Sequence, residues 1–139
     1  MQRYDAKRFI TTGIAVHEFS VCQALLNQLA ELAAERGADR VTRITIEVGP
    51  LSGIDPDLLA GAFAVARDGG CAAGAALAIE RTVVEISCIS CGAQSRTAPN
   101  RLVCSACGGY RTRVVAGEEL RLRRVEFHLP AQASAAYGD

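Results

Sequence analysis

Two Cys-x-x-Cys pairs constrain this chain more than any other feature of its sequence. Cys88 and Cys91 form the first pair and Cys104 and Cys107 the second, with twelve residues between the pairs. Each pair holds two sulfurs on one side of a tight turn, so four thiolates can reach one tetrahedral Zn²⁺. Four thiolates leave no open position for water or substrate. The spacing therefore predicts a structural zinc site in a zinc-ribbon-like unit over residues 87–114.

Length and charge limit the remaining possibilities. A chain of 139 residues makes one ordinary domain or two small ones. Fifteen basic and fifteen acidic residues cancel, so the whole chain shows no bias toward nucleic acid or membranes, and no apolar run is long enough to span a bilayer. Six cysteines without a secretory signal fit a reducing compartment, so we expect a cytoplasmic protein in which Cys22 and Cys71 are buried hydrophobes.

Helical periodicity predicts two helices. Apolar residues recur at three- and four-residue steps over 21–36, with Ser20 and Gln23 as a capping box and Gly37 as the stop. Asp55, directly before a proline, predicts the start of a second helix because its side chain can cap the free amides.

Alternating apolar residues predict strands over 41–48, 77–86 and 120–129. The last two strands change their apolar face midway and flank the cysteine stretch. We expect them to pair antiparallel and to run from one packed unit into another, with each change marking a bulge or a new neighbour. The predicted fold is α+β: two helices packed on a mainly antiparallel sheet, with the four-cysteine unit inserted.

This organisation divides the chain. Residues 1–15 lack a clear period, so we interpret them as a disordered extension or a misassigned start. Residues 16–86 and 115–129 form the α+β domain, residues 87–114 the zinc domain, and residues 130–139 a flexible tail.

Catalytic motifs are missing from the sequence. It has no phosphate-binding loop of the Gly-x-x-x-x-Gly-Lys type and no Gly-x-Ser-x-Gly nucleophile elbow. Its two histidines are His17 and His128, and we interpret His128 as a surface or packed residue. We therefore do not expect an enzyme.

Three stretches stand out together: residues 16–22, which begin Val16-His17-Glu18, residues 46–55, and the two Cys-x-x-Cys pairs, here called knuckles. In their order and spacing they resemble the HypA/HybF family of hydrogenase-maturation nickel chaperones. The similarity covers roughly residues 16–129. It implies a chaperone that delivers Ni(II) for maturation of a [NiFe] hydrogenase and carries a separate structural zinc.

The resemblance also implies a ligand set and partners. By position, His17 is the main nickel ligand, and Glu18 and Asp55 are carboxylate contributors. The implied partners are a GTPase of the maturation pathway and a nickel-enzyme precursor, either the hydrogenase large subunit or a urease system. Nitrogen-rich sites with added oxygen ligands suit Ni²⁺.

The sequence departs from the family pattern before His17. Family members begin Met-His-Glu, whereas here Val16 stands in place of the initiator and fifteen residues precede it. An internal residue offers an amide nitrogen and not a terminal amine. Because a GUG start codon is written as valine when a frame is extended upstream, we hypothesise that the natural chain begins at position 16 as Met-His-Glu.

Two alternatives come from other classes of protein. The cysteine unit could be a nucleic-acid-binding ribbon whose basic side comprises Arg111, Arg113, Arg121, Arg123 and Arg124, although zero net charge and few aromatic residues weigh against this. The knuckles could instead be redox dithiols, although neither pair lies between a strand and a helix as in thioredoxin-like proteins.

Overall fold

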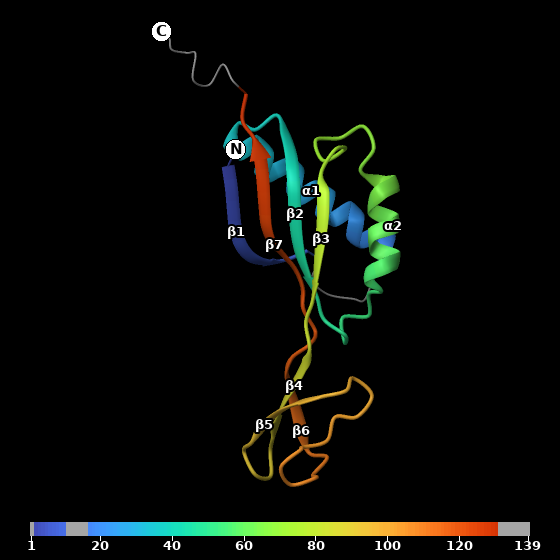
Figure 1. Ribbon diagram of the computed structural model, residues 1–139, viewed down its shortest axis with the longest axis vertical. Helices are drawn as coiled ribbons and strands as arrows, with labels where there is room; N and C mark the ends of the chain where they lie inside the picture. The colour runs from blue at the N-terminus through green and yellow to red at the C-terminus, as the bar shows by residue number, and fades with distance from the viewer. Residues whose placement is uncertain (1, 11–16, 131–139) are drawn as a thin grey trace.

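The structure, a computed structural model, describes residues 2–10 and 17–130 and consists of two units. The larger unit is a four-stranded sheet of order β1-β7-β2-β3 with two helices (Figure 1). Its elements are β1 (Gln2–Phe9), α1 (Glu18–Arg36), β2 (Arg40–Val48), α2 (Pro56–Ala66), β3 (Ala76–Arg81) and β7 (Leu120–His128). Only the β2–β3 pair is parallel, with α2 in the crossover between its strands. The predicted α+β fold with a mainly antiparallel sheet is confirmed.

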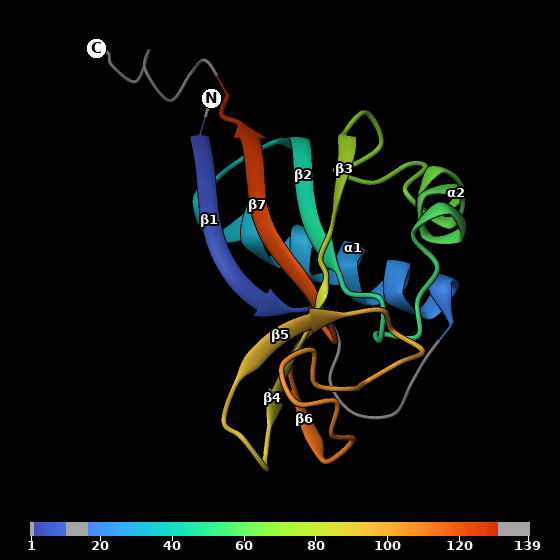
Figure 2. The same cartoon turned by 60° about the horizontal axis from the view of Figure 1, so that its bottom comes forward.

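The smaller unit is a three-stranded antiparallel sheet inserted between β3 and β7. Its order is β5-β4-β6, with β4 (Val84–Cys88), β5 (Gln94–Thr97) and β6 (Thr112–Ala116). The cysteine knuckles lie at the end of β4 and in the loop before β6. Figure 2 shows this unit below the larger sheet.

The core lies between the two helices and one face of the larger sheet. From α1, Leu25 and Leu29 are fully buried, and α2 adds Phe63. They belong to one cluster with Ile44 of β2 and Val125 of β7. At roughly 1.5–3 kcal/mol for each large apolar side chain removed from water, this core is the main source of stability.

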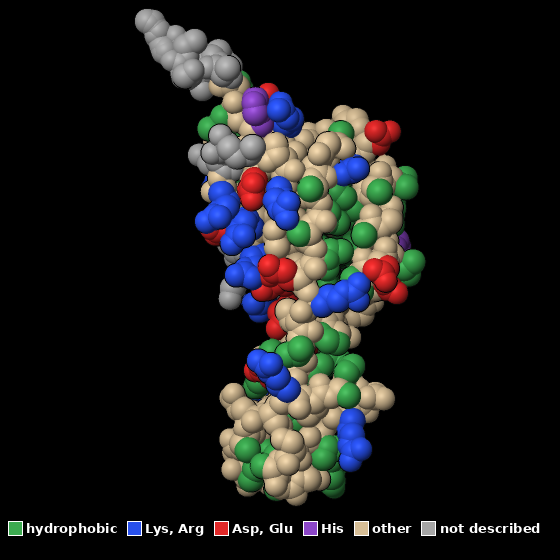
Figure 3. Space-filling view, viewed as in Figure 1, with side chains coloured by type: hydrophobic (Ala, Val, Ile, Leu, Met, Phe, Trp, Pro, Cys, Tyr) green, Lys and Arg blue, Asp and Glu red, His purple; other side chains and the backbone are tan. Residues whose placement is uncertain are grey.

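The opposite face of the larger sheet is open and charged. Arg123 contacts Glu80 at 2.6 Å, and Arg124 contacts Asp5 at 2.7 Å. Figure 3 shows basic and acidic side chains intermingled over this face. The charges pair with one another, as expected for a solvated sheet surface.

The helix predictions hold except at one terminus. Gly37 ends α1 with φ 65°, and Asp55 caps α2 by accepting the amide N–H of Asp57 at 2.9 Å. However, α1 begins at Glu18, with His17 as an N-cap residue that makes no side-chain capping bond. The expected Ser20 capping box is therefore wrong, because the helix continues one turn further toward the N-terminus.

The predicted pairing of strands 77–86 and 120–129 is also wrong. The first stretch is two strands: β3 pairs in parallel with β2, and β4 pairs with β5 and β6. β7 pairs with β1 and β2. The first change of apolar face is the passage from one sheet to the other. The second is a bulge near Arg123, where the register between β7 and β2 shifts, so both changes have the causes expected.

Residues 1–15 are predicted to be a disordered extension or a misassigned start, and for Gln2–Phe9 the first of these alternatives is wrong. They form β1, which pairs antiparallel with the edge of β7. Tyr4 packs on the core, and Ile10, 2% exposed, is part of it. Without β1, one edge of β7 would carry unpaired backbone N–H and C=O groups. Pairing with β1 supplies their hydrogen-bond partners. Residues 11–16 and the predicted tail from residue 131 lie outside the described residues.

Candidate metal centres

The four cysteines of the smaller unit converge on one point. Their sulfur atoms all lie within 4.8 Å of one another, with 3.6 Å between Cys88 Sγ and Cys107 Sγ and 3.6 Å between Cys91 Sγ and Cys104 Sγ. Zn–S bonds of about 2.3 Å in a tetrahedron place sulfurs about 3.8 Å apart. The cluster therefore fits a tetrahedral zinc ion, as the spacing of the knuckles predicts.

Matching backbone turns build the two knuckles. Gly92 donates its N–H to the carbonyl of Cys88, and Gly108 donates to the carbonyl of Cys104, both at 2.9 Å. Both glycines have positive φ, 78° and 76°, a conformation that a side chain would strain. Gly109 is restricted by space instead, because an added Cβ would lie 3.2 Å from Cys107 Sγ. The glycines after each pair thus allow the chain to wrap around the sulfurs.

Backbone N–H groups favour the thiolate form that metals bind. The N–H of Cys91 approaches Cys88 Sγ at 3.4 Å, and hydrogen bonding by this N–H lowers the pKa of Cys88 to about 6. The N–H groups of Cys107 and Ala106 likewise lower the pKa of Cys104. Two of the four ligands are thereby prepared for deprotonation.

The second candidate centre lies at the start of α1. His17 is exposed, and its Nε2 lies 3.2 Å from Ser20 Oγ. Glu18 Oε2 accepts the backbone N–H of Asp55 at 3.0 Å, across 37 residues of sequence. This bond lowers the pKa of Glu18. The fold thus brings Glu18 next to Asp55, and His17 is the residue directly before Glu18 in the chain.

These three side chains do not form a ready ligand cage. Among the described residues, the four cysteines are the only group of three or more candidate side chains whose ligand atoms lie this close together. Asp55 Oδ1 is occupied as the cap of α2, where it accepts N–H groups from Asp57 and Leu58. A metal held at His17 would therefore need backbone nitrogen atoms or some rearrangement of the carboxylates.

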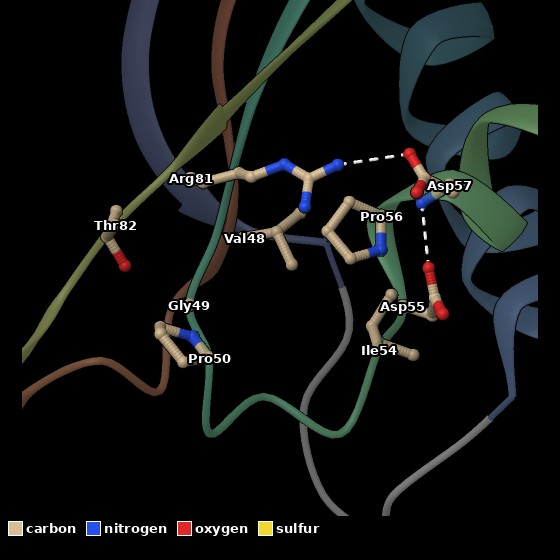
Figure 4. Close-up of a pocket in the computed structure, with 9 residues that line it drawn as sticks. All are labelled: Val48, Gly49, Pro50, Ile54, Asp55, Pro56, Asp57, Arg81 and Thr82. Carbon is tan, nitrogen blue, oxygen red and sulfur yellow. Dashed lines mark hydrogen bonds and ion pairs between the residues drawn. The ribbon is translucent and has the colours of Figure 1, made fainter. Parts of the chain in front are cut away.

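A hollow of about 430 Å³ lies next to Asp55 (Figure 4). Arg81 extends from the end of β3 and contacts Asp57 at 3.0 Å, and Pro50, Ile54 and Pro56 are among the apolar lining residues. No sequence pattern predicts this hollow, because its walls come from separate segments that only the fold brings together.

A hydrogen-bonded joint links the two units beside this hollow. Glu119 accepts the hydroxyl of Thr82 at 2.7 Å and the N–H of Gly117 at 3.0 Å. The N–H groups of Gly49 and Leu51 bond to the carbonyls of Glu119 and Gly117, each at 2.7 Å. The loop that leads to Asp55 is thus fastened to the strand connection of the cysteine unit.

The remaining sequence candidates have ordinary roles. His128 lies near the end of β7 and contacts Asp39 at 2.8 Å, so it is a partly exposed residue paired with a carboxylate. Cys22 is buried in the core and donates to the carbonyl of Leu59 at 3.6 Å. Burial raises the pKa of Cys22 to about 11, so this thiol stays protonated and unreactive.

Fold and cysteine cluster together define a metal-binding protein with an α+β body and an inserted four-thiolate unit. A model of the family described as "Hydrogenase/urease nickel incorporation, metallochaperone, hypA" matches residues 16–127. The chain belongs to this HypA family of nickel metallochaperones. The match begins after β1, so that strand lies outside the matched region.

Relatives support the assignment over most of the chain. The hydrogenase maturation factor HypA of Nitrosospira multiformis is 41% identical over 111 residues, covering 80% of this chain and 96% of that protein. HypA of Aquifex aeolicus is 33% identical over 114 residues, covering 82% and 99%. The solution structure of the Ni metallochaperone HypA from Helicobacter pylori aligns with a TM-score of 0.61 at 27% identity, covering 83% of this chain and all of that one.

Nucleic-acid binding and dithiol redox chemistry are not favoured by these findings. The matched family handles nickel, and the four sulfurs lie together as a metal-binding cluster. Among the described residues, no helix is long and apolar enough to cross a membrane.

Proposed function

We propose that this chain carries Ni(II) at the start of α1 and passes it to a [NiFe] hydrogenase precursor. The observation that carries this proposal is the helix start, where the exposed His17 precedes the half-buried Glu18, which accepts a hydrogen bond from the Asp55 N–H. An exposed site suits a carrier, because the ion must be released to another protein. Nickel is thus a cargo and not a resident cofactor.

The proposed ligands follow from the chemistry of Ni²⁺. The His17 imidazole and nearby backbone nitrogens supply the nitrogen atoms, with oxygen atoms from Glu18 and Asp55 completing the set. A chain that begins at position 16 would add a terminal amine to this set. Because the imidazole must be neutral to bind, acid should release nickel before zinc.

Zinc is the ion that we propose for Cys88, Cys91, Cys104 and Cys107. A closed four-thiolate site has no position for a substrate, so its role is structural. The three-stranded sheet that carries this site has little core of its own: Val84 and Ile86, both on β4, are its two buried aliphatic side chains among the described residues. Metal binding would supply much of its folding free energy.

We propose no catalytic activity for the chain itself. Its partners in this proposal are a maturation GTPase and a nickel-enzyme precursor, the hydrogenase large subunit or a urease system, and its compartment is the cytoplasm. The proposed domains are a nickel-handling part, residues 16–86 and 115–129, and a zinc part, residues 87–114. Free thiols at Cys22 and Cys71 are compatible with a reducing compartment.

Nickel titration of zinc-loaded protein tests the proposal. Chains beginning at position 1 and at position 16 would each be compared with their His17→Ala variants, and His128→Ala serves as the matched histidine control. We expect His17→Ala to abolish tight nickel binding while zinc content stays unchanged. Equal nickel binding by His17→Ala and the parent chain would refute the site.

Intact-mass measurement of protein expressed from its native locus tests the hypothesis that the natural chain begins at position 16. A mass that corresponds to Met-His-Glu at position 16 supports the hypothesis, and a mass that retains Met1 excludes it.

A further inference from the structure

The outer face of the β5-β4-β6 sheet is exposed to solvent. On β4, Val84, Ile86 and Cys88 are buried, so the alternation of side chains turns Glu85 and Ser87 outward. The register then places outward-facing partners on both neighbours. Arg96 of β5 lies opposite Glu85, and Arg113 of β6 lies opposite Ser87.

This unit carries an excess of positive charge. Residues 87–114 contain four arginines and no Asp, Glu or Lys, in a chain whose net charge is zero. Arg96 is compensated by Glu85 at 3.3 Å. Within the described part of the chain, Arg111 and Arg113 are exposed and take part in no ion pair. Two uncompensated guanidinium groups therefore lie on or beside β6.

Apolar side chains are exposed beside these arginines. Val115 is 47% exposed, and the burial alternation along β6 turns Arg113 and Val115 to the same side. Ile89, 58% exposed, donates its N–H to the carbonyl of Arg111 at 2.9 Å and so lies next to it. In the described chain β6 pairs with β4 alone, so no strand lies along its other edge.

We infer that the surface along β6, formed by Ile89, Arg111, Arg113 and Val115, docks an extended acidic segment of a protein partner. Charge complementarity favours an acidic partner. Two guanidinium groups without ion pairs, at alternating positions, match carboxylates at alternating positions of an extended strand. The apolar residues match apolar side chains of the same segment. Edge pairing with β6 would supply backbone hydrogen bonds.

A protein segment fits this surface better than nucleic acid does. Tyr110 is the single aromatic residue of residues 87–114, so bases would find almost no stacking platform. The inference rests on the proposed function only in assuming that the chain acts on protein partners.

Nuclear magnetic resonance titration of the full zinc-loaded chain tests the inference without nickel. The probe is an acetylated peptide with Ser at every second position and with Glu or Val at the positions between. The control is the same peptide with Lys in place of Glu. We expect the acidic peptide to shift the amide signals of β6 and of Ile89. Added salt should weaken its binding.

Charge reversal identifies the surface. Arg111→Glu combined with Arg113→Glu should weaken peptide binding about tenfold or more, the effect of losing two charge pairs and adding repulsion. Arg43→Glu is the matched control: Arg43 is exposed on β2 and, in the described chain, makes no ion pair. This variant should bind within about twofold of the parent chain.

Three outcomes would overturn the inference: no shifts on β6, equal weakening by Arg43→Glu, or tighter binding of single-stranded oligouridine than of the acidic peptide. Unchanged zinc content and signal dispersion in the variants would show that they fold. Because nickel is absent, failure here leaves nickel binding at His17 untouched, and failure of His17 leaves this surface intact.

Discussion

Asp55 has two roles that a single substitution can separate. Its carboxylate caps α2 through the N–H groups of Asp57 and Leu58, and its own N–H is held by Glu18. The first role concerns stability, whereas the second holds Asp55, itself a proposed oxygen ligand, next to Glu18. The cap was predictable from Asp55 and the following proline alone, because capping depends on adjacent residues.

Asp55→Ala should lower the free energy of unfolding by about 1 kcal/mol, the usual cost of losing an N-cap. Urea denaturation measures this. Asp57→Ala is the control, since it removes an exposed ion pair with Arg81 at 3.0 Å and should cost less. A loss from Asp57→Ala as large as that from Asp55→Ala would contradict the capping account.

Glu18 should make folding sensitive to mild acid. Hydrogen bonding from the Asp55 N–H holds the pKa of Glu18 below its ordinary value in the folded state. Its stabilising effect is therefore complete above the ordinary pKa and is lost as pH falls through the lower folded pKa. Glu18→Gln should flatten the pH dependence of unfolding in that window. An unchanged curve, or a Glu18 pKa at its ordinary value by nuclear magnetic resonance, would disprove this.

At the scale of elements, the close packing of Gly49 against Gly117 controls how the two units join. An added Cβ on Gly49 would collide with the Gly117 carbonyl oxygen. Gly117 has φ 122° and lies against Val84, so it cannot easily move away. The connection between β6 and β7 thus depends on a glycine in the loop after β2.

Gly49→Ala should therefore destabilise the protein by several kcal/mol or prevent folding. Gly61→Ala is the matched control: Gly61 lies inside α2 with nothing within 4 Å of an added Cβ, so alanine should stabilise by about 0.5–1 kcal/mol. Thermal unfolding distinguishes the two. Equal effects of the same sign would contradict the close approach.

Sequence patterns predicted where the helices and strands lie better than they predicted which strands pair with each other. Periodicity identified the helices and the strand at 41–48, because each depends on residues within a few positions. Pairing depends on the fold, so β3 beside β2 and β1 beside β7 were both missed. The Glu18–Asp55 bond was missed for the same reason, since it joins residues 37 positions apart. The convergence of the four cysteines was predictable, because each Cys-x-x-Cys turn is local and the spacing of the two pairs suits one shared ion.

At the scale of the whole molecule, the two units depend on different sources of stability. The larger unit has a continuous core that includes Leu25, Phe63 and Phe127. The smaller unit has little apolar interior, and its four sulfurs surround one point. A metal ion there should stabilise the second unit and leave the first largely unaffected.

Zinc removal should accordingly unfold one unit alone. After chelation, we expect the amide signals of residues 87–114 to lose dispersion while those of the larger sheet and both helices stay in place. Restoring zinc should recover the spectrum. Simultaneous loss of both sets of signals would show instead that the units fold as one.

We propose that two different ions occupy two chemically different places in this protein. X-ray absorption at the nickel and zinc edges of the doubly loaded protein tests this most directly. We expect zinc to be surrounded by four sulfur atoms at about 2.3 Å, and nickel to be surrounded by nitrogen and oxygen atoms without sulfur. Sulfur in the nickel shell, or nitrogen and oxygen replacing sulfur around zinc, would contradict it.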